Sequence, residues 1–185
     1  MGLMATIKRI VLRKTKDQLE LEYLLSHGMH LGKNSTIHTG CMIDSGWPWL
    51  ISIGDNVTIT PNVTILAHDA STNIVGLGTK LGRVNIGNNV FIGTGSTILC
   101  NTTIGDNVIV GAGSVVTRDL PGNAVYAGAP AVQVATIEEF RNRNVALRTE
   151  RPALDRIHKW DSWREAPLED KEKMKKALEN GIGFV

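Results

Sequence analysis

An aliphatic residue recurs at every sixth position through most of residues 31–116, and this period constrains the fold more than any other feature. An α-helix repeats its apolar positions every three or four residues and a half-buried β-strand every two, so neither explains a period of six. A parallel β-helix does, because its short strands form flat faces and one side chain of each unit points inward. The aliphatic positions are Leu31, Ile37, Ile43, Ile53, Ile59, Ile65, Ile86, Ile92, Ile98, Ile104, Val110 and Val116. Twelve units at three per turn predict four coils.

The other positions of the unit agree with this prediction. Glycine often follows the aliphatic residue, at Gly32, Gly54, Gly87, Gly93, Gly105 and Gly111. Four residues after the aliphatic residue comes a small or β-branched side chain, at Ser35, Cys41, Val57, Val63, Val90, Ser96, Thr102, Val108 and Ser114. The GDN and GNN steps place glycine, asparagine and aspartate at expected corners, where a positive φ is tolerated by these residue types.

Two breaks in the period predict two loops on one edge of the prism. Ile43 and Ile53 are separated by ten residues, so four are extra, and Ile65 and Ile86 by twenty-one, so fifteen are extra. Both insertions follow the third unit of a coil and therefore leave the same corner. Loops on a rigid scaffold commonly carry binding and catalytic residues. Stacking of adjacent coils brings Asp44, at the start of the shorter loop, to the same corner as His68, at the start of the longer one.

The charge is distributed unevenly along the 185 residues. Residues 31–130 contain nine charged side chains and fifteen of the nineteen glycines, whereas residues 131–185 contain twenty-one charged side chains. We therefore expect an N-terminal helical cap (1–30), a repeat domain (31–131) and a C-terminal helical extension (132–185). A net charge of +2 gives no argument for a nucleic-acid partner. The two cysteines form no disulfide framework, and without a secretory leader or an eighteen-residue apolar run we expect a cytoplasmic protein.

The two ends of the chain are expected to be helical. Residues 3–25 predict a helix that caps the open end of the solenoid. Its basic and apolar composition leaves open a peripheral contact with anionic lipid. In the tail we expect one helix from Thr136 to about Arg148 and a second over about 168–180, ended by Gly181. Trp160 and Trp163 between them are expected to pack on the prism or on a neighbouring subunit.

Four segments carry a resemblance to a known family. They are IDSGWPWLISIGDNVTI (43–59), VTILAHDAST (63–72), VNIGNNVFIGTGSTIL (84–99) and TTIGDNVIVGAGSVVTRDLPGNAVYAGAPA (102–131). With these segments the chain resembles the hexapeptide-repeat acyltransferases, and among them the sugar O-acetyltransferases, a group that includes maltose, galactoside and capsular polysaccharide enzymes. The resemblance implies a left-handed parallel β-helix, a homotrimer with active sites between subunits, and acetyl-CoA as co-substrate.

The resemblance also implies roles for particular residues. His68 matches the family's catalytic base, and Thr94 matches the residue whose backbone N–H meets the thioester oxygen. Ala112 matches a position with backbone contacts to the pantetheine arm, and Thr117 and Arg118 match positions near the adenosine phosphates. Phe91 stands where some members have tryptophan. Ala129 and Pro130 belong to the AGAPA motif, which here lacks the basic residue that often follows it.

The chemistry of acetyl transfer to a hydroxyl suits these residue types. A neutral imidazole can take the hydroxyl proton near pH 7, and a fixed N–H can stabilise the oxyanion. Asp44 would orient the far ring nitrogen of His68, with Asp69 as a rival for that role, although Asp44 could instead only cap a turn. Trp47 and Trp49 either pack under the loop or stack on a sugar face. Asp44, Asp69 and these two tryptophans are therefore the candidate acceptor-binding residues.

The sequence favours an acetyl-CoA-dependent O-acetyltransferase acting on a sugar or surface-glycan precursor by direct attack, without an acyl-enzyme and without a metal. One alternative is an N-acetyltransferase of an amino sugar or an antibiotic, which shares the scaffold. A zinc enzyme resembling γ-type carbonic anhydrases needs three histidine ligands, whereas His68 is the only histidine in residues 39–157. The third alternative is a non-catalytic solenoid.

Overall fold

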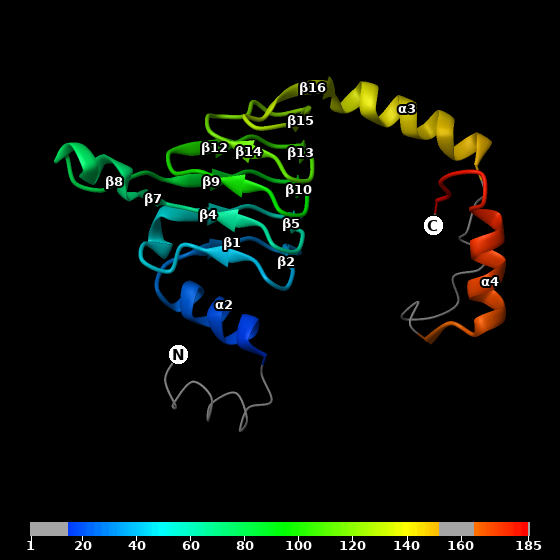
Figure 1. Ribbon diagram of the computed structural model, residues 1–185, viewed down its shortest axis with the longest axis horizontal. Helices are drawn as coiled ribbons and strands as arrows, with labels where there is room; N and C mark the ends of the chain where they lie inside the picture. Colours follow the sequence, from blue (N-terminus) through cyan, green and yellow to red (C-terminus); the bar gives the residue numbers. More distant parts are fainter. Residues whose placement is uncertain (1–14, 152–164, 185) are drawn as a thin grey trace. The chain divides into compact units, whose positions relative to one another are not determined.

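A computed structural model describes residues 15–151 and 165–184 of the chain. The chain divides into two compact units, residues 1–137 and residues 138–185. Figure 1 shows the first unit as a stack of coils with a helix at one end and a long loop projecting from one side.

Three parallel sheets form the faces of the stack. Sheet A contains β1 (His30–Leu31), β4 (Ile51–Ile53), β9 (Val84–Ile86) and β12 (Thr102–Ile104). Sheet B contains β2 (Thr36–Ile37), β5 (Thr58–Ile59), β10 (Phe91–Ile92), β13 (Val108–Val110), β15 (Ala124–Ala127) and β16 (Val132–Thr136). Sheet C contains β3 (Met42–Ile43), β6 (Thr64–Ile65), β11 (Thr97–Ile98) and β14 (Val115–Val116). The chain visits the sheets in the order A, B, C four times, so the predicted four coils of a left-handed parallel β-helix are confirmed.

The predicted inward positions form the core of the prism. In sheet A, Ile53 pairs with Ile86 and Ile86 with Ile104, so equivalent residues of successive coils lie directly over one another. From Ile43 onward the aliphatic residues of the repeat are buried. Leu31 and Ile37 in the first coil are only partly buried, because no further coil covers them from below.

A column of asparagines fixes the corner between sheets A and B. These asparagines all adopt positive φ, between 55° and 61°, and they are Asn34, Asn56, Asn89, Asn107 and Asn123. Each side-chain amide donates to the side-chain oxygen of the next asparagine, with N···O distances of 3.4, 3.2, 3.1 and 2.9 Å along the column. The left-handed residue of each GDN or GNN step is therefore the asparagine, which tolerates this conformation better than most residues.

The glycine that begins each GDN or GNN sequence has a different role. It allows adjacent coils to approach closely. A Cβ on Gly54 would lie 2.6 Å from the carbonyl oxygen of Gly87, and a Cβ on Gly87 would lie 2.4 Å from a carboxylate oxygen of Asp106. Neither glycine has a positive φ. Their role is to let adjacent corners touch.

Helix α2 (Lys16–Ser26) covers the first coil, as predicted for a cap. Thr15 and Gln18 form a capping box at its start, and Leu24, only 2% exposed, belongs to the apolar core. The predicted helix began at residue 3, but residues 1–14 lie outside the described part of the chain.

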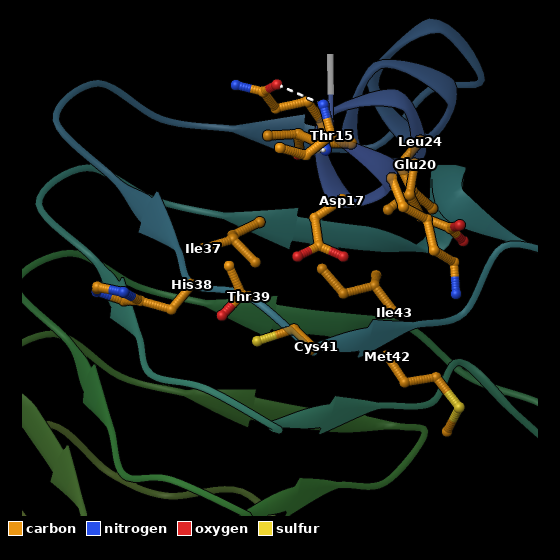
Figure 2. Close-up of a pocket in the computed structure, with 14 residues that line it drawn as sticks. Thr15, Asp17, Glu20, Leu24, Ile37, His38, Thr39, Cys41, Met42 and Ile43 are labelled. Atoms are coloured by element: carbon orange, nitrogen blue, oxygen red, sulfur yellow. Dashed lines mark hydrogen bonds between the residues drawn. The ribbon is translucent and has the colours of Figure 1, made fainter. Parts of the chain in front are cut away.

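A groove of about 600 Å³ separates α2 from the first coil (Figure 2). Its lining comes from the N-terminal half of α2 and from the turn between β2 and β3, with Ile37, Cys41 and Ile43 among the coil residues. Neither Asp44 nor His68 lines it, so this groove is separate from the predicted site.

The C-terminal extension is not entirely helical. Residues 132–136 form β16, which pairs antiparallel with β15 and so continues sheet B. The predicted helices follow as α3 (Ile137–Glu150) and α4 (Leu168–Ala177). In the second unit the guanidinium of Arg151 donates to the carbonyl oxygen of Asn180, at 2.9 Å. Trp160 and Trp163 lie outside the described residues.

We expect Asn89→Ala to lower the free energy of unfolding by about 1–3 kcal/mol, because alanine is strained at this φ and breaks two bonds of the column. Glycine adopts this φ freely, so Asn89→Gly should lower the free energy of unfolding by less than Asn89→Ala does. The decrease that remains is mainly due to the lost hydrogen bonds. Urea denaturation followed by circular dichroism measures both changes. Equal losses in the two variants would show that the left-handed conformation contributes nothing to the preference for asparagine.

Candidate active site

Both insertions leave the corner between sheets C and A, as the breaks in the period predict. The shorter joins β3 to β4 and contains a 3₁₀ turn, η1 (Pro48–Leu50). The longer joins β6 to β9 and contains β7 (His68–Asp69), η2 (Ala70–Val75) and β8 (Lys80–Leu81). β7 and β8 form an antiparallel pair, and the N–H of Gly82 donates to the carbonyl oxygen of Ala67 at 3.0 Å. The two ends of the long loop are therefore joined to each other at its base.

Asp44 is a buried carboxylate with hydrogen bonds to both oxygens. It follows β3 directly and is 6% exposed. Its Oδ1 accepts from the N–H of Gly46 at 3.1 Å, and its Oδ2 accepts from the N–H of Ala67 at 2.9 Å and from Nδ1 of His68. Asp44 therefore does more than cap its own turn, because its carboxylate also binds the ring of His68.

The contact with Asp44 determines the tautomer of His68. An ionised carboxylate can only accept hydrogen bonds, so Nδ1 carries the proton and, in the neutral ring, Nε2 carries the lone pair. The His68 side chain is 35% exposed, whereas that of Asp44 is 3% exposed. His68 is therefore partly exposed, while the carboxylate that binds its Nδ1 is buried.

The two tryptophans of the shorter insertion have different surroundings. Trp47 is partly buried, packs against the core, and lies with its ring centroid 4.5 Å from that of His68. Trp49 is 60% exposed. The sequence offered packing and sugar stacking as equal alternatives for both residues, but only Trp49 presents a largely open side chain.

Asp69 does not orient His68, so its rival role is wrong. Its carboxylate lies 2.5 Å from Nζ of Lys80, and its Oδ1 accepts from the N–H of Ser71 at 2.8 Å. The hydrogen bond from Lys80 holds the pKa of Asp69 well below its ordinary value, and Asp69 in turn raises the pKa of Lys80. A residue adjacent to the histidine in sequence points to the other side of the strand, which explains why Asp44 and not Asp69 reaches the ring.

Thr94 and Ala112 lie at a different corner, between sheets B and C. They occupy successive coils, and the N–H of Gly113 donates to the carbonyl oxygen of Thr94 at 2.9 Å. The hydroxyl of Thr94 also donates to that of Thr60, at 3.3 Å, a contact that the sequence analysis did not identify. Ala129 and Pro130 lie in the turn between β15 and β16, and the N–H of the next residue, Ala131, donates to the carbonyl oxygen of Val115 on β14 at 2.8 Å.

The remaining predicted cofactor residues are exposed. Phe91 lies on β10 of sheet B, in the same coil as Thr94 and shortly before it in the chain. Thr117 and Arg118 follow β14 and lie at the corner between sheets C and A, the corner of His68 but in the last coil. Within one chain, therefore, Asp44 and His68 meet, whereas Thr94 stands on another edge of the prism.

Two further properties concern only the described residues. In residues 15–151 and 165–184, no group of three or more histidine, cysteine or acidic side chains is arranged to hold a metal ion. None of the helices described is long and apolar enough to cross a membrane.

Comparisons with known proteins agree with this geometry. The family model described as bacterial transferase hexapeptide (six repeats) matches residues 83–118. Protein CapG of Staphylococcus aureus is 38% identical over 142 residues, which are 74% of this chain and 83% of CapG. Galactoside O-acetyltransferase of Escherichia coli is 38% identical over 114 residues, and the match spans 60% of this chain but only 55% of that protein.

Solved structures give the same result. A maltose O-acetyltransferase from Clostridium difficile 630 is 28% identical, with a TM-score of 0.51 over 73% of this chain and 89% of that one. A galactoside acetyltransferase in complex with coenzyme A is 27% identical, with a TM-score of 0.55 over 77% and 86% of the two chains. The chain belongs to the hexapeptide-repeat family of acetyltransferases.

We expect Lys80→Met to loosen the long loop, because it removes the ion pair that closes β7 against β8. Asp69→Ala should loosen it further, since it also removes the hydrogen bond to Ser71. Limited proteolysis between residues 70 and 79 measures the change. Because the pKa of Asp69 is lowered on folding, its contribution is complete above the ordinary aspartate pKa of about 4 and is lost as the pH falls further.

The matched control is Lys80→Arg, which keeps the positive charge and should be cleaved at a rate close to that of wild type. Cleavage of Lys80→Met at the wild-type rate would show that the exposed ion pair does not hold the loop.

Proposed function

We propose that the protein is an acetyl-CoA-dependent O-acetyltransferase whose acceptor is a hydroxyl of a sugar or surface-glycan precursor. The observation that carries the proposal is the pairing of buried Asp44 with half-exposed His68 at the edge where both insertions leave the prism. Family membership supports the acetyl transfer, and the sugar O-acetyltransferases among its relatives support the acceptor class. The relative solved with coenzyme A supports the donor.

In the proposed reaction, Nε2 of His68 removes the proton from the acceptor hydroxyl as its oxygen attacks the thioester carbonyl carbon. A tetrahedral intermediate forms and then collapses, the C–S bond breaks, and the imidazolium returns its proton to the sulfur of coenzyme A. Asp44 keeps the ring in the reactive tautomer and stabilises the imidazolium. The acetyl group passes directly to the acceptor, so no acyl-enzyme is needed.

The oxyanion requires a donor, and we propose that the backbone N–H of Thr94 supplies it. A fixed N–H is well suited to this task, and loss of one such donor commonly costs about 10²–10³ in rate. Because Thr94 and His68 lie at different corners of one prism, the Thr94 that serves a given His68 would belong to a neighbouring subunit. This separation supports a homotrimer with sites between subunits.

We propose that coenzyme A lies along the corner between sheets B and C. Gly95 and Gly113 take positive φ there, and a Cβ added to either would meet nothing within 4 Å, so the backbone is open to a ligand. Ala112 would contact the pantetheine arm, with Phe91, Ala129 and Pro130 beside it. Thr117 and Arg118, at the corner between sheets C and A, would reach the phosphates of a coenzyme bound along the corner of a neighbouring subunit, with Arg118 supplying positive charge.

Trp49 is the proposed sugar-stacking residue. Its indole is largely exposed and lies five residues after Asp44, on the same insertion. Aromatic rings bury large apolar areas, and a flat exposed ring on the insertion that supplies Asp44 suits the apolar face of a sugar. Because the carboxylate of Asp69 is paired with Lys80, we propose that Asp69 affects acceptor binding indirectly, by stabilising the long loop.

We expect His68→Ala to lower acetyl transfer by about 10²–10⁴-fold, because it removes the general base. Asp44→Asn should lower kcat by a similar range, because loss of the charge removes the preference for the reactive tautomer. Thiol release from acetyl-CoA, measured with sugars, amino sugars, serine and chloramphenicol, reports the activity. Circular dichroism checks that both variants remain folded.

The pattern across acceptors separates the alternatives. Turnover with amino sugars or chloramphenicol, and none with sugar hydroxyls, would replace O-acetylation by N-acetylation. If acetyl-CoA binds but none of these acceptors is acetylated, larger glycans are the next acceptors to test. Wild-type activity in His68→Ala would show that His68 is not the base.

The long loop supplies a surface for the proposed subunit contact. Its tip carries three exposed apolar side chains, with Ile74 at 90% and Leu77 at 79% exposure, together with Val75. We expect Ile74→Asp and Leu77→Asp to reduce the trimer fraction, because a charge cannot be buried in an apolar contact. Light scattering at several concentrations measures the mass.

Leu25→Asp on α2 is the control for this experiment, because Leu25 is also an exposed leucine but lies away from the loop. It should assemble as wild type does. An unchanged mass in both loop variants would exclude the loop tip from the subunit interface.

A further inference from the structure

The ring of Trp47 lies against the ring of His68. Their centroids are 4.5 Å apart and the ring planes are inclined by 49°. The Trp47 side chain is partly buried and packs on the apolar core, so it contacts the imidazole from the protein side. The His68 ring therefore contacts the carboxylate of Asp44 through Nδ1 and the indole of Trp47.

The backbone around Trp47 holds the indole in place. The N–H of Leu50 donates to the carbonyl oxygen of Trp47 at 3.0 Å, closing the turn of η1. Pro48 is buried and fixes the next φ, and on the other side the N–H of Gly46 is bound by Asp44. The insertion that supplies the carboxylate thus also supplies the aromatic ring, and both are anchored.

We propose that Trp47 is a positioning residue for His68, one that restricts the imidazole to a single orientation and stabilises it when it becomes cationic. This inference rests on the proposed role of His68 as base. A cation within about 6 Å of an indole centroid is attracted by the negative face of the ring, and tryptophan is the strongest such partner. The attraction is greater for the imidazolium than for neutral imidazole, so it favours the transition state over the ground state.

This assignment separates the two tryptophans of the insertion. Trp47 acts on the base and should influence the rate of proton removal. Trp49, exposed and proposed to stack on the acceptor, should influence acceptor binding. Substitutions at positions two residues apart are therefore expected to change different kinetic constants.

The experiment compares Trp47→Phe, Trp47→Leu and Trp49→Leu in steady-state acetyl transfer to the best acceptor. We expect Trp47→Leu to lower kcat by about 2- to 30-fold with little change in the acceptor KM. Trp47→Phe keeps an aromatic face and should lose less. Trp49→Leu should raise KM with a smaller effect on kcat.

Equal losses of kcat in Trp47→Phe and Trp47→Leu would overturn the proposal, because apolar packing alone would then explain them. A loss confined to KM would overturn it as well. Thermal unfolding of each variant shows whether the fold is retained.

Proton NMR of the wild-type protein provides a test that does not depend on a variant folding. We expect nuclear Overhauser contacts between the His68 ring and the Trp47 indole at neutral pH and at pH 5, with the His68 signals identified by their absence in His68→Asn. Absence of these contacts at either pH would overturn the proposal.

The same measurements distinguish failure of this inference from failure of the proposed function. Full kcat in Trp47→Leu with an inactive His68→Ala would refute the role of Trp47 and leave the base intact. Full activity in His68→Ala would refute the base itself, whatever the tryptophan variants do.

Discussion

The structure depends on the contact between successive corners of the prism. At the corner between sheets A and B, glycine leaves room for the close approach of the next coil, and an asparagine in the left-handed conformation donates its amide to the asparagine of the next coil. The strands themselves are only two to five residues long, so little regular structure exists within any one coil. Regularity arises between coils, where each corner and each inward isoleucine or valine finds its equivalent in the neighbour.

The catalytic candidates Asp44 and His68 lie where the regular coils end and the two insertions begin. The N–H of Asp44 still donates to the carbonyl oxygen of Ile65 at 2.9 Å, as an ordinary coil residue would. Beyond that bond the chain departs into the insertions, and the side chains of Asp44 and His68 are free to face each other. The coils hold the backbone of Asp44, the pairing of β7 with β8 holds that of His68, and the loops provide the surroundings that a uniform prism lacks.

Much of the fold followed from the sequence because a period of six leaves few alternatives. The pairing of Asp44 with His68 could also be predicted, since strand stacking decides which residues of adjacent coils meet. The contacts of Trp47 with His68 and of Asp69 with Lys80 could not, because they depend on loop conformations that no period specifies. Strand β16 was missed for a similar reason: residues 132–136 pair antiparallel with β15 and fall outside the repeat.

The geometry of the candidate pair is independent of the length of the solenoid. Asp44 directly follows β3 and His68 lies three residues after β6, and β3 and β6 pair in register on the first two coils, so the contact between the two side chains depends on these coils and on the insertions that leave them. Coils can be added or removed beyond the third without altering that contact. A prism of this kind can therefore be longer or shorter, with a correspondingly different outer surface, while the contact between Asp44 and His68 stays the same.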